Sequence, residues 1–489
     1  MIRPGKKTSP KTRTPLNIWI TKTPQQIHEA SEQTLLKKNL RAVDLAALGI
    51  GSVVGTGIFV ATGQGSQLAG PGIVLSFIIA ALTCAFCALT YSELACMFPV
   101  AGSTYSYSYV AFGEVIAWII GWDLMLEYLV AASAVASGWS TTFIPLLQQM
   151  GLKLPQALIT PPVTTSEAGK VVFSGGVVDL PAVLITMGIS WILYIGIRES
   201  ARINNIIVAI KIAVILLFVF LGVSHVDFTN FNPFAPFGWK GIMAGAAIIF
   251  FAYIGFDAVS TAAEETKNPK RDVPLGLMLC LGVIIVLYVS VAFVLTGMVP
   301  FREIDVGNAL PGALARIGIR WGGALVATGA IIGMISTLLV TLYGQVRIFM
   351  VMARDGLLPA SFSRVHPVHK TPHICTWITG AATALIAGLF PLTMIIDLCN
   401  IGTLFAFVLV SIGVIVLRKT RPEVERKFRT PGVPYTPLLT VAFCFYLMYS
   451  LPGVTWIRFG GWLAAGLLIY FIYSVKHSKL QLALRKKQS

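Results

Sequence analysis

The sequence has few charged residues for its length. Asp, Glu, Lys and Arg make up 12% of its 489 residues, whereas an ordinary soluble domain carries about 25%. A soluble protein of this size could not cover its surface with so few charges. Composition therefore excludes a soluble enzyme, a disordered chain and a disulfide scaffold, and it indicates an integral membrane protein.

Cysteine and histidine are scarce and show no ligand spacing. All seven cysteines lie in or beside apolar stretches, which predicts buried, reduced thiols. The pair Cys84 and Cys87 has no second pair and no nearby histidine. Three histidines cluster in residues 366–373, where two prolines break the helix that a metal site would need. No nucleophile or nucleotide motif is present, so we expect no metal, no cofactor and no enzymatic activity.

A cleavable signal peptide is also missing. The first forty residues are polar and basic. The first apolar stretch begins near Asp44, and it is too long and too rich in glycine for a signal sequence.

Long apolar stretches dominate the rest of the chain. A bilayer core about 30 Å thick needs roughly 20 apolar residues per helix. The candidate segments are 43–67, 72–98, 114–138, 181–198, 203–223, 241–262, 275–299, 321–350, 374–391, 394–417, 434–452 and 456–475. We therefore predict an all-α integral membrane protein with 12 transmembrane helices.

The basic residues predict the orientation. An even number of helices puts both termini on one side of the membrane. If that side is the cytoplasm, 29 of the 37 Lys and Arg lie in inner segments and seven in outer loops. This bias satisfies the positive-inside rule, so we expect both termini of a cytoplasmic-membrane protein to be cytoplasmic. The net charge of +16 then sets orientation and does not indicate a nucleic-acid partner.

Glycines interrupt two predicted helices at matching positions. Gly55 and Gly255 lie 200 residues apart, each in the helix that opens a block of five. Because five is odd, the second block is inverted relative to the first, a pattern that points to a transport site at mid-membrane. The predicted organisation is a tail at 1–40, a first repeat at 41–223, a second repeat at 241–417, two further helices at 434–475 and a tail at 476–489.

A helix broken within a membrane exposes N–H groups on one half and carbonyls on the other. The N–H groups favour a carboxylate and the carbonyls favour a cation. An α-amino acid carries both charges. Close helix packing is the alternative explanation of Gly55 and Gly57, because small residues let helices approach. The matching glycine at position 255 favours the transport site.

The fifth predicted helix contains Lys211, flanked only by apolar residues. An ionisable residue within the membrane is a functional candidate by default. Lys211 follows Arg202 by nine residues, about 13 Å along a helix, which is too deep for comfortable snorkelling. We therefore predict that Lys211 takes part in proton coupling.

Several acidic residues in the predicted helices have roles that the sequence leaves open. Asp123 and Glu127 are spaced i, i+4 and share one helix face. Contact with substrate or gate and a buried interhelical hydrogen bond are both compatible with that spacing. Asp257 follows the second break, where it serves a gate or a structural pair. For Glu93 a structural salt bridge is expected.

Four stretches together resemble a known family. They are DLAALGIGSVVGTGIFVATG (44–63), FFAYIGFDAVSTAAEETKNPKRDVP (250–274), GQVRIFMVMARDGLLP (344–359) and FRTPGVPYTP (428–437). The chain resembles bacterial members of the amino acid–polyamine–organocation superfamily, in its cationic amino acid transporter group. The resemblance implies a LeuT-type 5+5 inverted repeat with discontinuous helices 1 and 6.

The resemblance also implies a site at both breaks. The substrate carboxylate would meet the backbone near Gly55 and Gly57, and Phe251 would be the outer gate. Ala252 and Ile254 would offer carbonyls to the amine, and Lys211 matches a lysine of proton-coupled relatives. The implied substrate contacts are Ile50, Ser52, Val53, Gly55, Thr56, Gly57, Phe251, Ala252, Ile254 and Met334. The candidate pocket or gate residues are Asp123, Glu127, Asp257, Ser336 and Thr337.

We therefore expect a secondary active transporter that moves an α-amino acid together with a proton by alternating access. Amino acid exchange without net proton coupling remains the alternative. The choice between a cationic and a neutral substrate stays open, because no acidic cluster beside the breaks forces a pocket for a cationic side chain, for which Glu127 is the candidate. The expected partners are the amino acid, the proton and the lipid bilayer. The resemblance adds a small single-span membrane peptide as a candidate partner. We expect the protein to function as a monomer.

Overall fold

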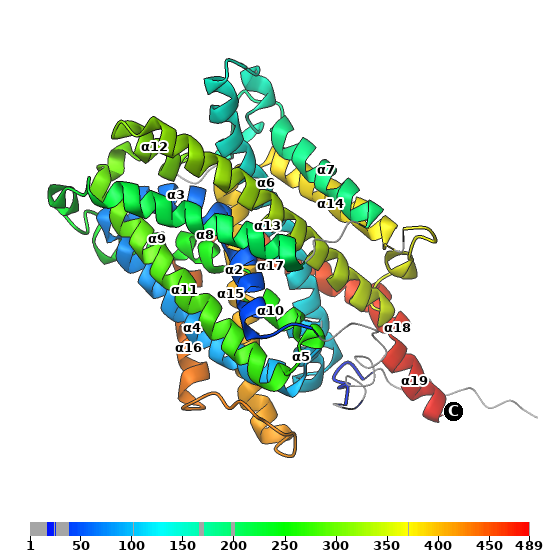
Figure 1. Ribbon diagram of the computed structural model, residues 1–489. Coiled ribbons are helices and arrows are strands. Elements are labelled where there is room, and N and C mark those ends of the chain that lie inside the picture. The colour runs from blue at the N-terminus through cyan, green and yellow to red at the C-terminus, as the bar shows by residue number, and fades with distance from the viewer. Residues whose placement is uncertain are drawn as a thin grey trace, which may run out of the picture.

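The computed structural model describes residues 17–23, 25, 39–100, 102–165, 171–196, 201–369 and 371–488. Its helices pack side by side in one bundle (Figure 1). Within this described part, eight helices are long and apolar enough to cross a membrane. Four shorter apolar helices accompany them, Ala42–Val53, Leu180–Ile195, His373–Leu389 and Tyr435–Tyr449. Each of the twelve predicted segments coincides with a helix or with two half-helices, while the number of crossings stays a prediction.

The first half of the chain begins with an interrupted helix. Its elements are α2 (Ala42–Val53), η1 (Gly57–Ala61), α3 (Thr62–Ala69), η2 (Gly70–Gly72), α4 (Ile73–Met97), α5 (Ser103–Ala111), α6 (Glu114–Gln149), η3 (Gln156–Leu158), β1 (Val163–Thr165), β2 (Val171–Phe173), α7 (Leu180–Ile195) and α8 (Ala201–Val223). The helix α6 runs eleven residues beyond the predicted end at position 138.

The second half begins with another interrupted helix. Its elements as far as the tenth predicted segment are η4 (Phe228–Phe231), α9 (Gly238–Ile249), η5 (Phe250–Tyr253), α10 (Ala258–Thr261), η6 (Ala263–Glu265), α11 (Pro269–Met298), η7 (Phe301–Glu303), α12 (Ala309–Arg316), α13 (Arg320–Arg354), η8 (Ala360–Ser363), α14 (His373–Leu389) and α15 (Leu392–Thr420). The chain ends with α16 (Tyr435–Tyr449), α17 (Gly453–Ile469), η9 (Tyr470–Ser474), α18 (Val475–His477) and α19 (Lys479–Gln488).

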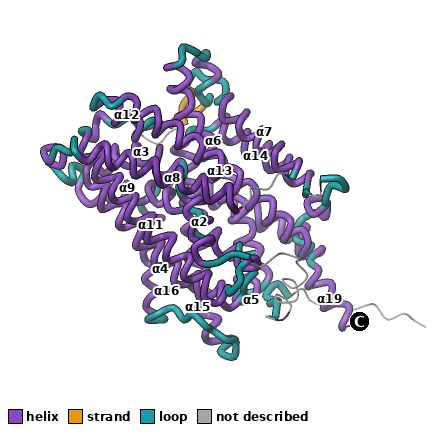
Figure 2. Tube along the Cα trace, in the orientation of Figure 1, coloured by secondary structure: helices purple, strands orange, loops and turns teal. Residues whose placement is uncertain are grey.

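The all-α prediction needs one correction. Strands β1 and β2 pair antiparallel in the loop between α6 and α7, with Val163 opposite Phe173. Figure 2 shows this short hairpin at one end of an otherwise helical molecule. Runs such as Val171-Val172-Phe173 are β-branched and aromatic, which favours a strand once the chain has left the bundle.

The helices around the site described below pack closely on one another. The longest two, α6 and α13, pack against each other, and α15 packs on the other side of α6. The interrupted helix that begins with α2 packs against α11 and α8. Helices α7 and α14 form a separate pair on the flank of the bundle (Figure 1).

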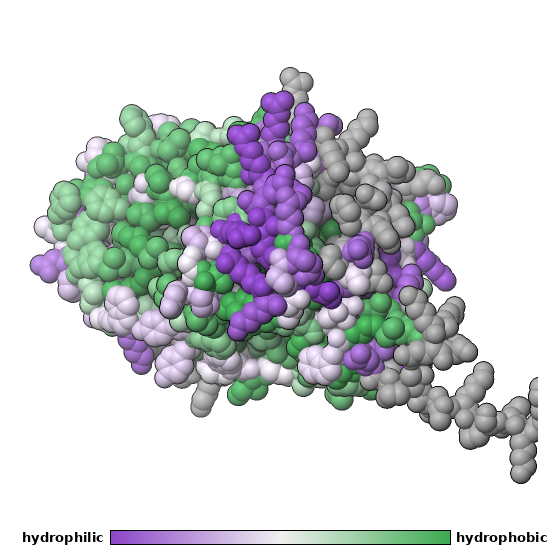
Figure 3. Space-filling view, turned by 90° about the horizontal axis from the view of Figure 1, so that it is seen from below, coloured by the Kyte–Doolittle hydropathy of each residue, from purple (hydrophilic) through white to green (hydrophobic). Residues whose placement is uncertain are grey.

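The surface separates by polarity. Figure 3 shows a band of hydrophilic side chains across one face of the molecule, beside a broad apolar surface. Large apolar side chains are exposed on the outer faces of helices, among them Phe220 on α8, Val286 on α11 and Ile457 on α17. In a soluble protein so much exposed apolar surface would be a liability, whereas lipid accommodates it.

Two predictions about individual side chains are confirmed. All seven cysteines are buried and free of disulfides. Glu93, at the end of α4, is buried and forms a salt bridge with Arg418 of α15 at 2.7 Å. Its carboxylate also accepts the backbone N–H of Thr430 at 2.7 Å, so it ties the loop after α15 to the bundle.

Candidate functional site

The first break lies between Val53, where α2 ends, and Gly57, where η1 begins. A helix end leaves its last carbonyls without partners inside the helix. Side chains of three other helices satisfy them here. Lys211 of α8 donates to the Gly51 carbonyl at 2.6 Å, and Tyr288 of α11 donates to the Val53 carbonyl at 3.3 Å. The hydroxyl oxygen of Thr337, on α13, lies 3.2 Å from the Val54 carbonyl oxygen.

The second break follows η5. Ile254 is extended, with φ −62° and ψ 139°, and Gly255 has a φ of +109°. That conformation favours glycine. A Cβ on Gly255 would also lie 2.9 Å from the Ser52 hydroxyl, so the residue is needed for space as well as for conformation.

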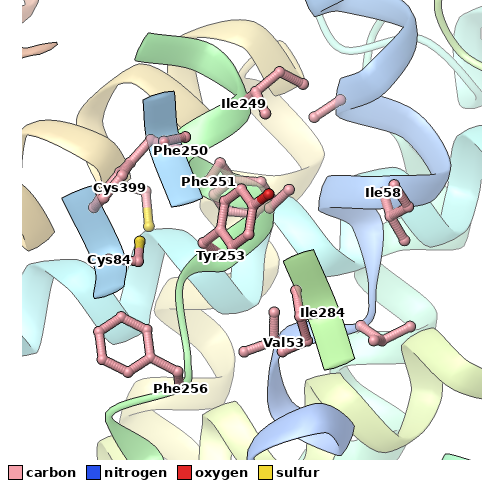
Figure 4. Close-up of a cluster of buried hydrophobic side chains, with 14 of the residues drawn as sticks. Val53, Ile58, Cys84, Ile249, Phe250, Phe251, Tyr253, Phe256, Ile284 and Cys399 are labelled. Atoms are coloured by element: carbon pink, nitrogen blue, oxygen red, sulfur yellow. The ribbon is translucent and has the colours of Figure 1, made fainter. Parts of the chain in front are cut away.

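The two breaks meet at the centre of the bundle. Figure 4 shows the ribbon leaving its helical form between Val53 and Ile58, and again between Tyr253 and Phe256 nearby. A Cβ on Gly57 would lie 2.3 Å from the Cα of Ala252. Close packing therefore does explain Gly57. The close approach of Gly57 to Ala252 brings the two breaks together.

A cavity of about 50 Å³ lies between the breaks. It is lined by Ser52, Val53, Gly55, Thr56, Gly57, Glu127, Tyr128, Ala131, Val135, Phe251, Ile254, Gly255, Asp257, Ala258, Thr337 and Thr341. Small-molecule sites measure about 300–1,000 Å³, whereas a water molecule takes about 30 Å³. The cavity is therefore too small for an amino acid in this conformation, and a ligand of that size requires the lining to move.

Most of the predicted site residues line this cavity. They are Ser52, Val53, Gly55, Thr56, Gly57, Phe251, Ile254, Glu127, Asp257 and Thr337. Ile50, Ala252, Met334, Ser336, Asp123 and Lys211 are not part of the lining. Met334 lies behind Thr56, whose hydroxyl is 3.3 Å from its sulfur, and Ala252 faces Gly57.

Six lining residues were not singled out from the sequence as site residues. They are Tyr128, Ala131, Val135, Gly255, Ala258 and Thr341. Helical spacing was a usable signal for three of them. Ala131 and Val135 continue the face of Glu127 at i+4 and i+8, and Thr341 continues the face of Thr337. The sequence indicates that Gly255 interrupts the helix, and the structure adds that it lines the cavity.

Lys211 lies behind the wall of the cavity. Its side chain is fully buried and donates to the Thr337 hydroxyl at 2.8 Å as well as to Gly51. Thr337 itself lines the cavity. Lys211 therefore connects the last turn of α2 to α13, one residue away from the cavity.

Asp123 and Glu127 lie in different surroundings, although they share one helix face. Glu127 lines the cavity, as does Asp257. Asp123 is buried one turn earlier, beside Gly402 of α15. Neither of its carboxylate oxygens has a hydrogen-bond partner among the described residues. The interhelical hydrogen bond considered for this pair is therefore not formed by Asp123 in the described part of the chain.

Comparison with known proteins places the chain in a family of transporters. The family model described as amino acid permease matches residues 40–472. Branched-chain amino acid permease BcaP of Bacillus subtilis is 49% identical over 455 residues, covering 93% of this chain and 97% of the relative. Methylthioribose transporter of Bacillus subtilis is 49% identical over 451 residues, covering 92% and 96%.

A plant relative is more distant. Cationic amino acid transporter 4, vacuolar, of Arabidopsis thaliana is 36% identical over 398 residues, covering 79% of this chain and 64% of the relative. The family match and the relatives identify a transporter and not an enzyme. The chain belongs to the amino acid permease family and is a multi-pass membrane protein.

Proposed function

We propose that this protein moves branched-chain amino acids across the cell membrane by alternating access. The main support is the cavity that lies between the two helix breaks. The N-terminal end of one half-helix and the C-terminal end of another border it, and these ends carry opposite partial charges. The start of η1 at Gly57 offers N–H groups to a carboxylate, and the end of η5 offers carbonyls to an ammonium. The two Bacillus subtilis relatives at 49% identity support a small substrate.

The cavity lining supports a substrate with an apolar side chain. Its lining includes the apolar side chains of Val53, Ala131, Val135, Phe251 and Ile254. Such a surface favours an aliphatic side chain, because its burial removes apolar area from water. Phe251 and Ile254 come from the second interrupted helix, so a change in that helix would open or close the site.

Proton-coupled symport is the second part of the proposal. The support is Lys211, a buried amine that holds the carbonyl end of α2 and touches Thr337 of the cavity wall. Loss of its proton would remove the positive charge that strengthens the hydrogen bonds from Lys211 to α2 and α13. The contact would then loosen, and the inner half of the first interrupted helix would be free to move. Exchange of amino acids without net proton movement is the alternative.

A second substrate class follows from one observation. The methylthioribose transporter is as similar to this chain as the branched-chain permease, at 49% identity. Glu127 and Asp257 both line the cavity, and carboxylates accept hydrogen bonds from sugar hydroxyls as readily as from an ammonium. A thioether sugar is therefore the second candidate substrate.

One uptake experiment separates these candidates. Purified protein in proteoliposomes takes up labelled L-isoleucine under an imposed pH gradient, in competition with each of the twenty amino acids and with methylthioribose. We expect isoleucine, leucine and valine to compete most strongly. Uptake of labelled methylthioribose without uptake of labelled isoleucine would support the sugar, and uptake that needs internal amino acid but no pH gradient would support exchange.

The proposal also covers the orientation of the protein in the membrane and its organisation into repeats. We infer cytoplasmic termini from the distribution of lysine and arginine, and two inverted repeats from the matching breaks. Cysteine labelling of sealed vesicles at introduced positions in the N-terminal tail and in the β1–β2 loop tests the orientation, because a membrane-impermeant reagent reaches only one of them from outside.

A further inference from the structure

A second, larger cavity lies between α6, α12 and α13. Its volume is about 380 Å³, inside the range of small-molecule sites. Thr142 and Leu146 of α6, Pro311 of α12, and Ala324 and Ala327 of α13 form much of its wall. It therefore has room for an amino acid in the present conformation, whereas the cavity at the breaks does not.

The two cavities share the same pair of helices. Val135 lines the central cavity and Thr142 lines the second one, about 10 Å further along α6. Trp139 lies between them on the same helix face and stacks on Phe143 at 4.5 Å. In the proposed orientation the second cavity is on the outer side, so a substrate arriving from outside meets it first.

Two polar side chains in the lining of this cavity suit the two charged groups of an amino acid, Arg320 as a cation and Asn308 as a hydrogen-bond acceptor. Arg320, the first residue of α13, is exposed and forms no ion pair with a described carboxylate. The Oδ1 of Asn308 is buried and accepts no hydrogen bond from any described residue. A buried acceptor without a partner is unfavourable, so a ligand donor would stabilise it.

We propose that this cavity is a second amino acid site, in which Arg320 binds the carboxylate and Asn308 accepts a hydrogen bond from the ammonium. Leu146 and Ala327 would contact the aliphatic side chain. The proposal rests on the proposed amino acid substrate and adds an outer site from which the substrate moves past Trp139 to the breaks. The phosphate of an anionic lipid would also pair with Arg320, so the experiment includes such a lipid as the other occupant.

Equilibrium binding of labelled L-isoleucine to the protein in phosphatidylcholine nanodiscs tests the proposal. We expect two molecules bound per wild-type protein and one per Arg320→Ala variant, in which affinity for the outer site falls about tenfold or more. Ala324→Phe, which fills the cavity without removing charge, should also leave one. Arg302→Ala is the matched control, because Arg302 is an exposed arginine outside the lining, and it should leave two.

The outcomes separate the two proposals. One bound isoleucine in wild type, unchanged by Arg320→Ala, contradicts the outer site and leaves the proposed function standing. No bound isoleucine in wild type contradicts both. If Arg320→Ala changes only the retention of phosphatidylglycerol, measured by mass spectrometry of protein purified with that lipid, the cavity is a lipid site and the proposal is wrong.

Discussion

The side-chain nitrogen of Lys211 lies 2.6 Å from the carbonyl oxygen of Gly51, in the last turn of α2. An interrupted helix leaves such carbonyls open, and in a membrane no water is at hand to satisfy them. Lys211 therefore holds the end of one half-helix in place from a neighbouring helix. Its second bond, to Thr337, brings the same contact to the cavity wall.

Removal of this amine should separate transport from proton movement. In the Lys211→Ala variant we expect a pH gradient to drive no accumulation of isoleucine, while exchange of internal for external isoleucine continues. The reason is that the proposed proton site is lost and the cavity lining is kept. Uptake and counterflow in the same proteoliposomes measure both. Lys240→Ala, at an exposed lysine, is the control and should behave as wild type.

The stem of Lys211 crosses α13 at Gly333. A Cβ on Gly333 would lie 3.0 Å from the lysine Cγ, closer than ordinary van der Waals contact. We expect Gly333→Ala to displace the amine from Gly51 and to lower proton-driven uptake severalfold. Gly282→Ala is the matched control, since a Cβ there meets nothing within 4 Å. Equal activity of the two variants would show that the position of the amine has no influence on coupling.

The approach of Gly57 to Ala252 should tolerate no side chain. A methyl group at Gly57 would lie 2.3 Å from a backbone atom, which cannot be relieved by a rotamer change. We expect Gly57→Ala to abolish uptake and to lower the melting temperature of the purified protein. Gly188→Ala, where a Cβ meets nothing within 4 Å, should change neither. Wild-type uptake in Gly57→Ala would mean that the breaks need not stay in contact.

The sequence was sufficient for the helices and the breaks, because both depend on local composition. Apolar length set the segments, and glycine at positions 55 and 255 marked where helices stop. The close contact of Gly57 with Ala252 could not be read in the same way. It depends on how two helices about 200 residues apart pack, which no local pattern specifies.

The site was predicted less evenly than the fold. Residues beside a break, such as Ser52 and Ile254, line the cavity because the break itself forms it. Tyr128 was not predicted as a lining residue, although it does line the cavity. Which residues of α6 face the cavity depends on how α6 is rotated against α13, and the sequence does not specify that rotation. The same rotation places Asp123 outside the lining and Glu127 in it. The strand pair between α6 and α7 was missed because three-residue strands leave almost no periodicity.

The different positions of Asp123 and Glu127 lead to a prediction about substrate selection. We expect Glu127→Gln to raise the KM for isoleucine severalfold or to change the order of competing substrates, because its carboxylate borders the cavity. Asp123→Asn should leave the order of competitors unchanged. Competition profiles of the two variants measure the difference. Identical profiles would remove Glu127 from the substrate site.

Glu93 should affect stability without affecting substrate recognition. It is buried against Arg418, and removal of one partner of a buried ion pair costs about 3–5 kcal/mol. We expect Glu93→Gln to lower the melting temperature clearly while the KM of the remaining folded protein stays the same. Glu425→Gln is the control, because Glu425 pairs with Lys270 at the exposed surface. A changed KM in Glu93→Gln would give this salt bridge a role in transport.

The most direct measurement of the central claim is accumulation of labelled L-isoleucine in proteoliposomes of the wild-type protein, with an acidic outside and no internal amino acid. We expect internal isoleucine to rise above the external concentration, a proton-conducting ionophore to abolish the rise, and Lys211→Ala to show none. Undiminished accumulation in Lys211→Ala, or accumulation in wild type that ignores the pH gradient, would contradict that claim.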